Sequence, residues 1–257
     1  MRFVLLHGLG ADRTQPLDLV GPVLDGLGVP ASDVVAPDVR AHGASAVVGE
    51  PADFALDRLA DEVAAVARHA VGADEPATIV GISMGAAIGL RICLRGLLPV
   101  ERVVFVRPAF DDRSLPEHLR AFPVIGELLR ESGPRDGAER FRRTEPYLRV
   151  ARESPAGGRG LLSQFTSTDA ARRAIRLVEI PRNRAFGAES ELDGLAGRGI
   201  RSLVVGAPRD PVHPFALAER WAGALGSPLV RVPARDDGPA AQTAALRDAV
   251  GRWLSGS

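Results

Sequence analysis

Short apolar runs alternate along the chain with longer segments in which apolar residues recur at helical spacing. The runs that we predict to be strands cover residues 2–6, 34–36, 78–80, 103–106, 202–205 and 229–232. Their nearly continuous Val, Ile and Leu content is typical of strands covered on both faces, as in a parallel sheet. Helical spacing predicts helices over 56–70, 215–225 and 240–254. The alternation predicts a doubly wound, mostly parallel α/β fold with ligands at the carboxyl ends of its strands.

The alternation is interrupted once, between residues 110 and 198, where broken apolar patches carry many Arg and Glu residues. We predict that this segment is a helical lid inserted into an α/β core formed by residues 1–109 and 199–257. A lid over the strand ends would give a site walls and exclude water. Residues 154–160, rich in Gly, are expected to form a flexible joint inside it. The aromatic residues that could line the site or hold the lid helices together are Phe122, Phe141, Tyr147, Phe165 and Phe186.

The motif Gly81-Ile82-Ser83-Met84-Gly85 lies between the predicted strand 78–80 and an apolar stretch with helical character. A serine between two glycines at a strand-to-helix turn indicates a nucleophile elbow, which presents the hydroxyl above the sheet edge. Glycines are needed because a Cβ at either position would collide with the neighbouring strand or helix. Met84 would offer its backbone N–H at the helix N-terminus, where developing negative charge is stabilised.

A second glycine turn, His7-Gly8-Leu9-Gly10, follows the first predicted strand. Such a turn can direct a backbone N–H toward the serine, and we expect Leu9 to supply this second oxyanion donor. Gly8 would permit the turn, and His7 would brace it. The alternative is an ordinary turn that ends a strand.

In these motifs and in their order the chain resembles the α/β-hydrolase superfamily, in particular its small bacterial members with a lid. The likeness also includes residues 38–45, which contain Asp-x-Arg-x-His-Gly, and residues 205–211 near the C-terminus, so it spans nearly the whole chain. Residues 161–165 are similar to lid stretches of one bacterial group. The resemblance implies hydrolysis of an ester, thioester or related small carbonyl compound. It also implies Ser83 as nucleophile and an acid after the strand 202–205, for which Asp210 is the candidate.

The resemblance further implies a histidine base after the last strand, and the sequence departs from it there. Residues 234–247 contain no histidine, and none occurs after His213. Gln242 is the best match to the histidine position, and another alignment would put Asp236 or Asp237 there. An amide neither accepts nor donates a proton near pH 7, so the expected triad is atypical.

Other histidines are alternative candidates for the base. His213 follows Asp210 closely, where it is either the base or the cap of a helix that begins at Pro214. His118 could reach the site from the lid, whereas His42 is expected to be structural or to line the pocket floor. His69 is expected on a solvated helix face. Geometry must decide among them.

Three functional hypotheses follow from the missing C-terminal histidine. Loss of a triad base costs about 10⁴–10⁶ in rate, while the oxyanion hole and binding still leave about 10³–10⁴ over water. The first hypothesis is a serine hydrolase with Ser83, Asp210 and a compromised third position at Gln242. The second is non-hydrolytic carbonyl chemistry, a cyclisation or elimination, on a small secondary metabolite. The third is a catalytically inactive binding protein.

Composition excludes several other classes of function. The formal net charge of the 257 residues is zero and no basic stripe occurs, so we expect no nucleic-acid partner. No stretch approaches the roughly 20 apolar residues that cross a bilayer, and the apolar run after Met1 ends too early for a signal peptide, so we expect a cytoplasmic protein that does not bind membranes. The single cysteine, Cys93, excludes an intrachain disulfide. We expect no metal and no cofactor, and the sequence carries no signal for an oligomeric state.

Overall fold

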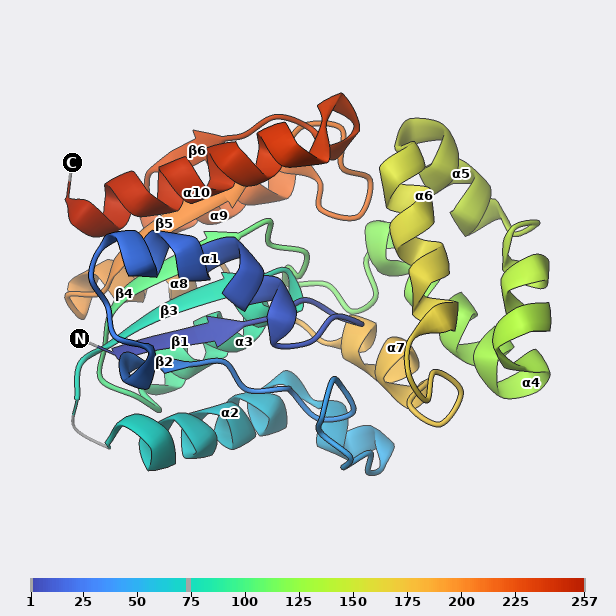
Figure 1. Cartoon of the computed structure of the whole chain (residues 1–257), viewed down its shortest axis with the longest axis horizontal. Helices are drawn as coiled ribbons and strands as arrows, with labels where there is room; N and C mark the ends of the chain where they lie inside the picture. Colours follow the sequence, from blue (N-terminus) through green and yellow to red (C-terminus); the bar gives the residue numbers. More distant parts are fainter. Residues whose placement is uncertain (1, 73–74, 257) are drawn as a thin grey trace.

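The computed structural model describes residues 2–72 and 75–256, and its centre is a parallel sheet (Figure 1). In this part of the chain six strands lie in the order β2-β1-β3-β4-β5-β6. Every neighbouring pair is parallel. The strands are β1 (Arg2–Leu6), β2 (Val34–Val35), β3 (Ala77–Ile82), β4 (Val100–Val106), β5 (Arg201–Gly206) and β6 (Leu229–Arg231). The predicted fold class, a doubly wound parallel sheet with a helical insertion, is confirmed.

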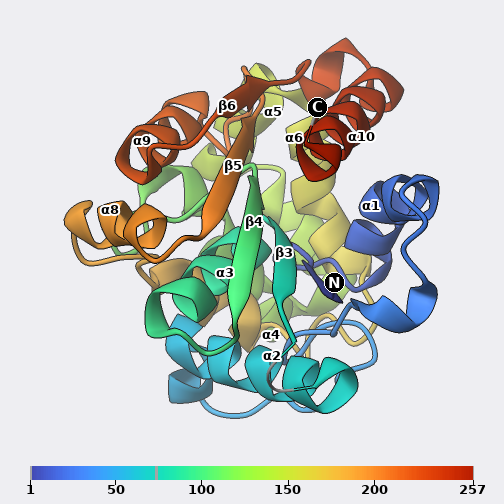
Figure 2. The same ribbon diagram turned by 90° about the vertical axis from the view of Figure 1, so that its left-hand side faces the viewer.

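Helices cover both faces of the sheet, and the strand sequences explain why (Figure 2). One face carries α1 (Thr14–Gly26) and α10 (Pro239–Ser255). The other carries α2 (Leu56–Val71), α3 (Met84–Arg95), α8 (Ser190–Gly197) and α9 (Phe215–Leu225). Side chains alternate between faces along a strand, so Leu5 joins the α1/α10 core while Leu6 joins the opposite core. Both faces need apolar cover, which explains the continuous apolar runs.

The three helices predicted from helical spacing are present, with bounds within a residue or two of the prediction. Helix α1 is the element that the hydrophobic pattern did not predict. Its sequence contains Pro16, Pro22 and two glycines, which obscure the helical spacing. Val20 and Leu24 nevertheless face the core, so tertiary packing compensates for a weak local preference.

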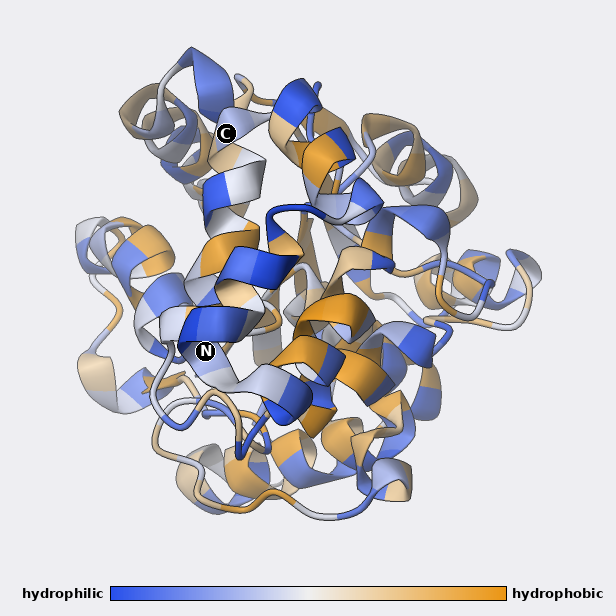
Figure 3. Cartoon of the chain, turned by 90° about the vertical axis from the view of Figure 1, so that its right-hand side faces the viewer, coloured by the Kyte–Doolittle hydropathy of each residue, from blue (hydrophilic) through white to orange (hydrophobic). Residues whose placement is uncertain are grey.

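Between β4 and β5 the chain forms a group of helices beyond the carboxyl end of the sheet (Figure 1). They are α4 (Ala121–Phe141), α5 (Glu145–Glu153), α6 (Pro155–Leu162) and α7 (Ile175–Glu179). Short 3₁₀ turns occur at Ala31–Asp33, Pro51–Phe54, Glu117–Leu119, Ser163–Thr166, Ile180–Arg182 and Arg235–Asp237. Hydrophobic and hydrophilic residues alternate along the helices of this end, as expected of helices with one face packed inward (Figure 3). We call residues 110–198 the insertion; its exact limits stay a prediction, because α8 packs on α9 and β5 rather than on α4–α7.

The prediction of a flexible joint at residues 154–160 is wrong, because residues 155–160 lie in helix α6 and Ser154 is its N-cap. Ser154 caps the helix by accepting a hydrogen bond from Gly157 N at 2.9 Å. Gly158 is needed for close packing, since an added Cβ would lie 2.9 Å from the Cβ of Ala151 in α5. Gly158 therefore allows the close contact between α6 and α5.

Polar contacts hold the insertion against the core at several places. The buried Arg173 donates to the Gly43 carbonyl at 2.8 Å, and the neighbouring Arg176 donates to the Ala41 carbonyl. Asn183 accepts from Leu56 N at 2.9 Å. These contacts join the insertion to segments far away in the sequence.

Within the described residues, no helix combines the length and the apolar character that a membrane span requires.

Candidate active site

The turn between β3 and α3 holds Ser83 in a backbone conformation that residues other than glycine rarely adopt, with φ 55° and ψ −109°. The flanking glycines make the turn possible. A Cβ at Gly81 would lie 2.3 Å from the Gly85 carbonyl oxygen, and one at Gly85 would lie 2.4 Å from the Leu6 carbonyl oxygen. Ser83 N donates to the Val106 carbonyl at 2.9 Å, which ties the turn to β4. Ser83 thus sits at the carboxyl edge of the sheet, beside its central strands.

A chain of hydrogen bonds runs from Ser83 to an acid through His213. The Ser83 Oγ and the His213 Nε2 are 2.9 Å apart, and the His213 Nδ1 lies 2.9 Å from an oxygen of Asp210. With Nδ1–H donating to the carboxylate, Nε2 is left as the acceptor for the serine hydroxyl. His213 and Asp210 are both largely buried. This arrangement has the geometry in which a serine can lose its proton to an oriented base.

The loop after β5 explains how Asp210 and His213 come together although they are so close in sequence. One carboxylate oxygen of Asp210 accepts from the backbone N–H groups of Val212 and His213, at 3.1 and 3.0 Å. The turn formed in this way folds the imidazole back onto the other oxygen. Pro211 and Pro214 limit the backbone on either side. The acid therefore fixes its histidine through both backbone and side chain.

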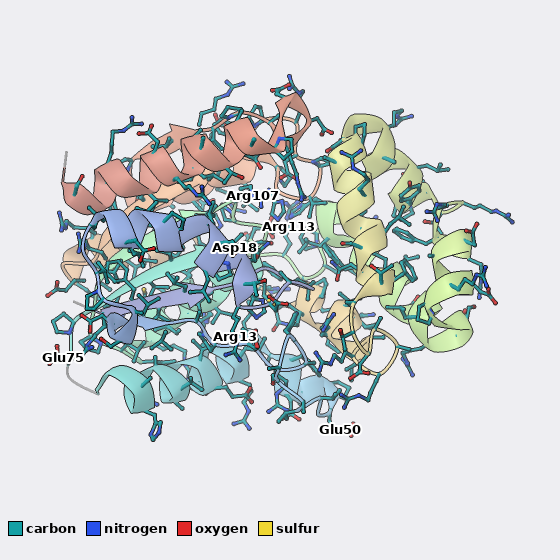
Figure 4. All side chains as sticks on the ribbon, viewed as in Figure 1. Arg13, Asp18, Glu50, Glu75, Arg107 and Arg113 are labelled. Atoms are coloured by element: carbon teal, nitrogen blue, oxygen red, sulfur yellow. The ribbon has the colours of Figure 1, made fainter. Side chains whose placement is uncertain are left out.

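Asp210 is ionised in a buried position. Burial alone would raise the pKa of this carboxyl, but the neighbouring His213, through its charge and hydrogen bonds, and the Arg107 guanidinium hold the pKa well below its usual range. Arg107 Nη1 lies 3.6 Å from the Asp210 carboxylate. Arg107, labelled in Figure 4, follows β4 directly and has a positive φ of 48°. A charged Asp210 can stabilise an imidazolium on His213.

The glycine turn after β1 lies against Ser83. A Cβ at Gly8 would be 3.5 Å from the Ser83 Cβ, so the turn lies directly beside the serine. In the described part of the chain, neither the Leu9 nor the Met84 backbone N–H has a hydrogen-bond partner. Two free N–H groups on the two segments that meet at Ser83 are what stabilisation of an oxyanion would require. The Met84 side chain, by contrast, is buried in the core.

His7 is fully buried and braces this turn instead of facing the cavity. Its Nε2 accepts from Val39 N at 3.0 Å, which leaves Nδ1–H to donate to the Gly8 carbonyl at 2.9 Å. Burial lowers the pKa of His7, so the neutral ring is favoured. Gly8 N donates to Gln15 Oε1 at 2.8 Å and is therefore already used. The amide of Leu9, the next residue, has no such partner in the described part of the chain.

Gln242 does not take part in this arrangement, which corrects the expectation of an amide at the base position. Gln242 is a buried residue of helix α10, and its side-chain nitrogen donates a hydrogen bond to the Pro233 carbonyl at 2.9 Å. The alternatives Asp236 and Asp237 lie elsewhere too: Asp236 accepts from Ser154 and Ala156 in the insertion, and Asp237 pairs with Arg209. The imidazole beside Ser83 comes from the loop after β5, so no residue from the loop after β6 is needed there.

The other histidines lie away from Ser83. His118 Nε2 contacts the Ala109 carbonyl at 2.7 Å, and His42 Nδ1 contacts the Arg40 carbonyl at 2.8 Å. The His42 ring is fully buried, 4.9 Å from that of His7, and burial lowers its pKa well below the usual value. His69 is exposed on α2. None of the three contacts the hydroxyl.

A cavity of about 330 Å³ lies over Ser83 between the sheet edge and the insertion. Its apolar lining comes from both parts: Leu9, Ala11, Ile82, Phe110, Leu119, Phe122, Leu161 and Val212. Among the insertion aromatics named above, Phe122 lines the cavity. Phe141 instead packs on Tyr147 and Phe165, at ring-centroid distances of 5.3 and 5.6 Å, and Phe186 packs on Trp221. This volume is near the lower end for small-molecule sites.

Several polar cavity residues were not foreseen from the sequence, namely Gln15, Arg107, Gln164, Arg209 and Arg235. They lie in five separate segments, and no spacing in the sequence connects them. For Arg107 a signal did exist, because a charged residue directly after a buried strand must lie at the carboxyl edge of the sheet.

Among residues 2–72 and 75–256, no cluster of His, Cys, Asp and Glu could hold a metal ion.

Comparisons with known proteins agree with this architecture. Residues 3–249 match the Alpha/beta hydrolase family. A malate-bound thermophilic esterase from Thermogutta terrifontis is similar, with 22% identity and a TM-score of 0.68 over 99% of this chain and 89% of the other. The enol-lactonase from Burkholderia xenovorans LB400 is also similar, with 22% identity and a TM-score of 0.66 over 98% of this chain and 90% of the other. MenH from S. aureus has 14% identity and a TM-score of 0.70 over 100% of this chain and 92% of the other. A search of curated protein sequences found no match. Since the family match covers nearly the whole sequence, the chain belongs to the alpha/beta hydrolase family.

Proposed function

We propose that the protein is a serine hydrolase that cleaves an ester, thioester or similar carbonyl bond of a small molecule. The observation that carries the proposal is the continuous hydrogen-bond chain from Ser83 through His213 to Asp210, with 2.9 Å at each link. Esterases and a lactonase among the structural relatives are compatible with this reaction class. The substrate class stays broad at this point, because the fold is shared by many chemistries.

In the proposed mechanism, Ser83 Oγ attacks the carbonyl carbon of the substrate while its proton moves to His213 Nε2. The oxygen of the tetrahedral intermediate accepts hydrogen bonds from the Leu9 and Met84 amides. As the intermediate collapses, the imidazolium gives its proton to the leaving oxygen or sulfur, and an acyl-Ser83 ester remains. Asp210 stays ionised and stabilises the imidazolium throughout.

Water completes the cycle in the second half-reaction. His213 takes a proton from the water as its oxygen attacks the acyl carbon, and the second tetrahedral intermediate uses the same two amides. The proton then returns to Ser83 Oγ, and the carboxylic acid leaves. The helical insertion serves this chemistry by closing the cavity from solvent, which strengthens each electrostatic contact inside it.

The non-hydrolytic and inactive alternatives followed from the absence of a base after the last strand. The 2.9 Å contact between His213 Nε2 and Ser83 Oγ supports a base from another loop, which favours hydrolysis over both alternatives. None of the described residues that line the cavity favours either alternative specifically.

A fluorophosphonate probe and a panel of 4-nitrophenyl esters of short acids test the proposal. We expect rapid labelling and release of 4-nitrophenol by the wild-type protein, and loss of both in Ser83→Ala. Ser163→Ala is a matched control, because Ser163 lines the same cavity but its hydroxyl donates to the Gly160 carbonyl. Turnover by Ser83→Ala at nearly the wild-type rate would contradict the role given to Ser83.

A further inference from the structure

The polar lining of the cavity is unbalanced in charge. Three arginines line it, Arg107, Arg209 and Arg235, whereas the one carboxylate of the lining is Asp210. Arg209 is paired with Asp237, outside the lining. Asp210 is already bound to His213 and to two backbone amides. Positive charge in the cavity therefore exceeds what the protein itself neutralises.

Arg107 is the clearest case of an unmet demand for acceptors. Its side chain is 14% exposed, and in the described part of the chain its guanidinium donates no hydrogen bond. The Nε is buried without a partner, and the nearest carboxylate oxygen is 3.6 Å from Nη1. Arginines this far from water are normally hydrogen-bonded to an anion, because leaving the donors unmet is costly. The site at which those donors can be met is the cavity.

Arg235 adds a second positive charge to the cavity lining. It lies in the 3₁₀ turn after β6 and is exposed, and no ion pair or hydrogen bond of its side chain is found among the described residues. Its charge is close enough to Arg107 to lower the pKa of that guanidinium, after the larger effect of burial. Two like charges near one another repel, and an anion between them would remove the repulsion. Gln164, 8% exposed with an unpartnered side-chain oxygen, is a further polar group on the cavity wall.

We propose that the cavity binds a substrate that carries a carboxylate besides the carbonyl group attacked by Ser83, and that Arg107 and Arg235 hold this carboxylate. This assignment deepens the proposed hydrolase function and rests on it for the reaction, though not for the binding. Guanidinium groups match carboxylates in a bidentate geometry, and the low exposure of Arg107 strengthens such a pair. A cavity of about 330 Å³ accommodates a compact acidic molecule better than a long chain.

Binding to Ser83→Ala tests the assignment without any need for turnover. Glutarate and glutaramide have similar size and differ in charge, so titration calorimetry on this variant isolates the recognition of carboxylates. We expect glutarate to bind at least about tenfold more tightly than glutaramide, the gain from a single charge-assisted pair. Arg235→Gln in the same background should remove most of this preference, and Arg107→Gln should abolish it. Arg107→Lys, which keeps the charge next to Asp210, should retain part of it.

Arg58→Gln is the matched control, because Arg58 is exposed on α2, away from the cavity. It should leave the preference unchanged. Equal binding of the two ligands, or a preference unchanged in both Arg235→Gln and Arg107→Gln, would overturn the assignment. Inorganic phosphate that binds as tightly as glutarate would show a general anion site and would also overturn it. Because the readout is binding, failure here is distinct from failure of the hydrolase proposal, which the labelling of Ser83 measures.

Discussion

Replacement of His213 by alanine should nearly abolish hydrolysis while leaving the fold intact. The imidazole makes both hydrogen bonds of the chain between Ser83 and Asp210, so its removal takes away the hydrogen-bond partner that the Ser83 hydroxyl has among the described residues. Removal of the base in a serine triad costs about 10⁴–10⁶ in kcat. At about 1.36 kcal/mol per factor of ten, this corresponds to roughly 5–8 kcal/mol of transition-state stabilisation.

The assay is release of 4-nitrophenol from an ester that the wild-type protein hydrolyses, with folded protein quantified by circular dichroism. Gln242→Leu separates the two candidate base positions. It removes one hydrogen bond to the Pro233 carbonyl, which should cost about 0.5–1.5 kcal/mol of stability and leave kcat within a factor of about two. If His213→Ala kept a tenth of the activity while Gln242→Leu lost it, the reasoning from the geometry would be refuted.

Two further predictions concern stability. Gly85→Ala should lower the free energy of unfolding by about 1–3 kcal/mol, because the new Cβ would lie 2.4 Å from the Leu6 carbonyl oxygen. Gly194→Ala, where a Cβ meets nothing within 4 Å, should instead raise the free energy of unfolding by up to about 1 kcal/mol. Urea unfolding of both variants checks this, and equal effects would contradict the packing argument. Burial holds the pKa of His42 well below its usual value of about 6.5. Below pH 6.5 the unfolded chain therefore binds a proton that the folded chain excludes. The stability contributed by the neutral ring is complete above this pH and is lost as the pH falls below it. The free energy of unfolding should therefore depend less steeply on pH between about 7 and 5 in His42→Gln than in the wild type, and an unchanged slope would show that His42 is not the group responsible.

The sequence by itself determined the features that local backbone demands and hydrophobic period can express. Buried strands must be apolar on both faces, so their runs were visible without coordinates. The turn at Ser83 admits glycine alone at Gly81 and Gly85, and the contacts that forbid a Cβ there are the reason that the motif could be recognised. The likeness to α/β hydrolases rests on these local requirements and on their order along the chain.

The tertiary structure alone decided which side chains meet Ser83. His213 is 130 positions away in the sequence, and no local pattern states whether its ring caps α9 or turns toward the serine. The hydrogen bonds of Asp210 to the backbone of its own loop settle that choice, because they fold the ring back toward the edge where β3 and β5 end. The arginines of the cavity come from separate loops for the same reason: in a parallel sheet, segments distant in sequence share one edge. Their common position is a property of the sheet order, which sequence spacing does not contain.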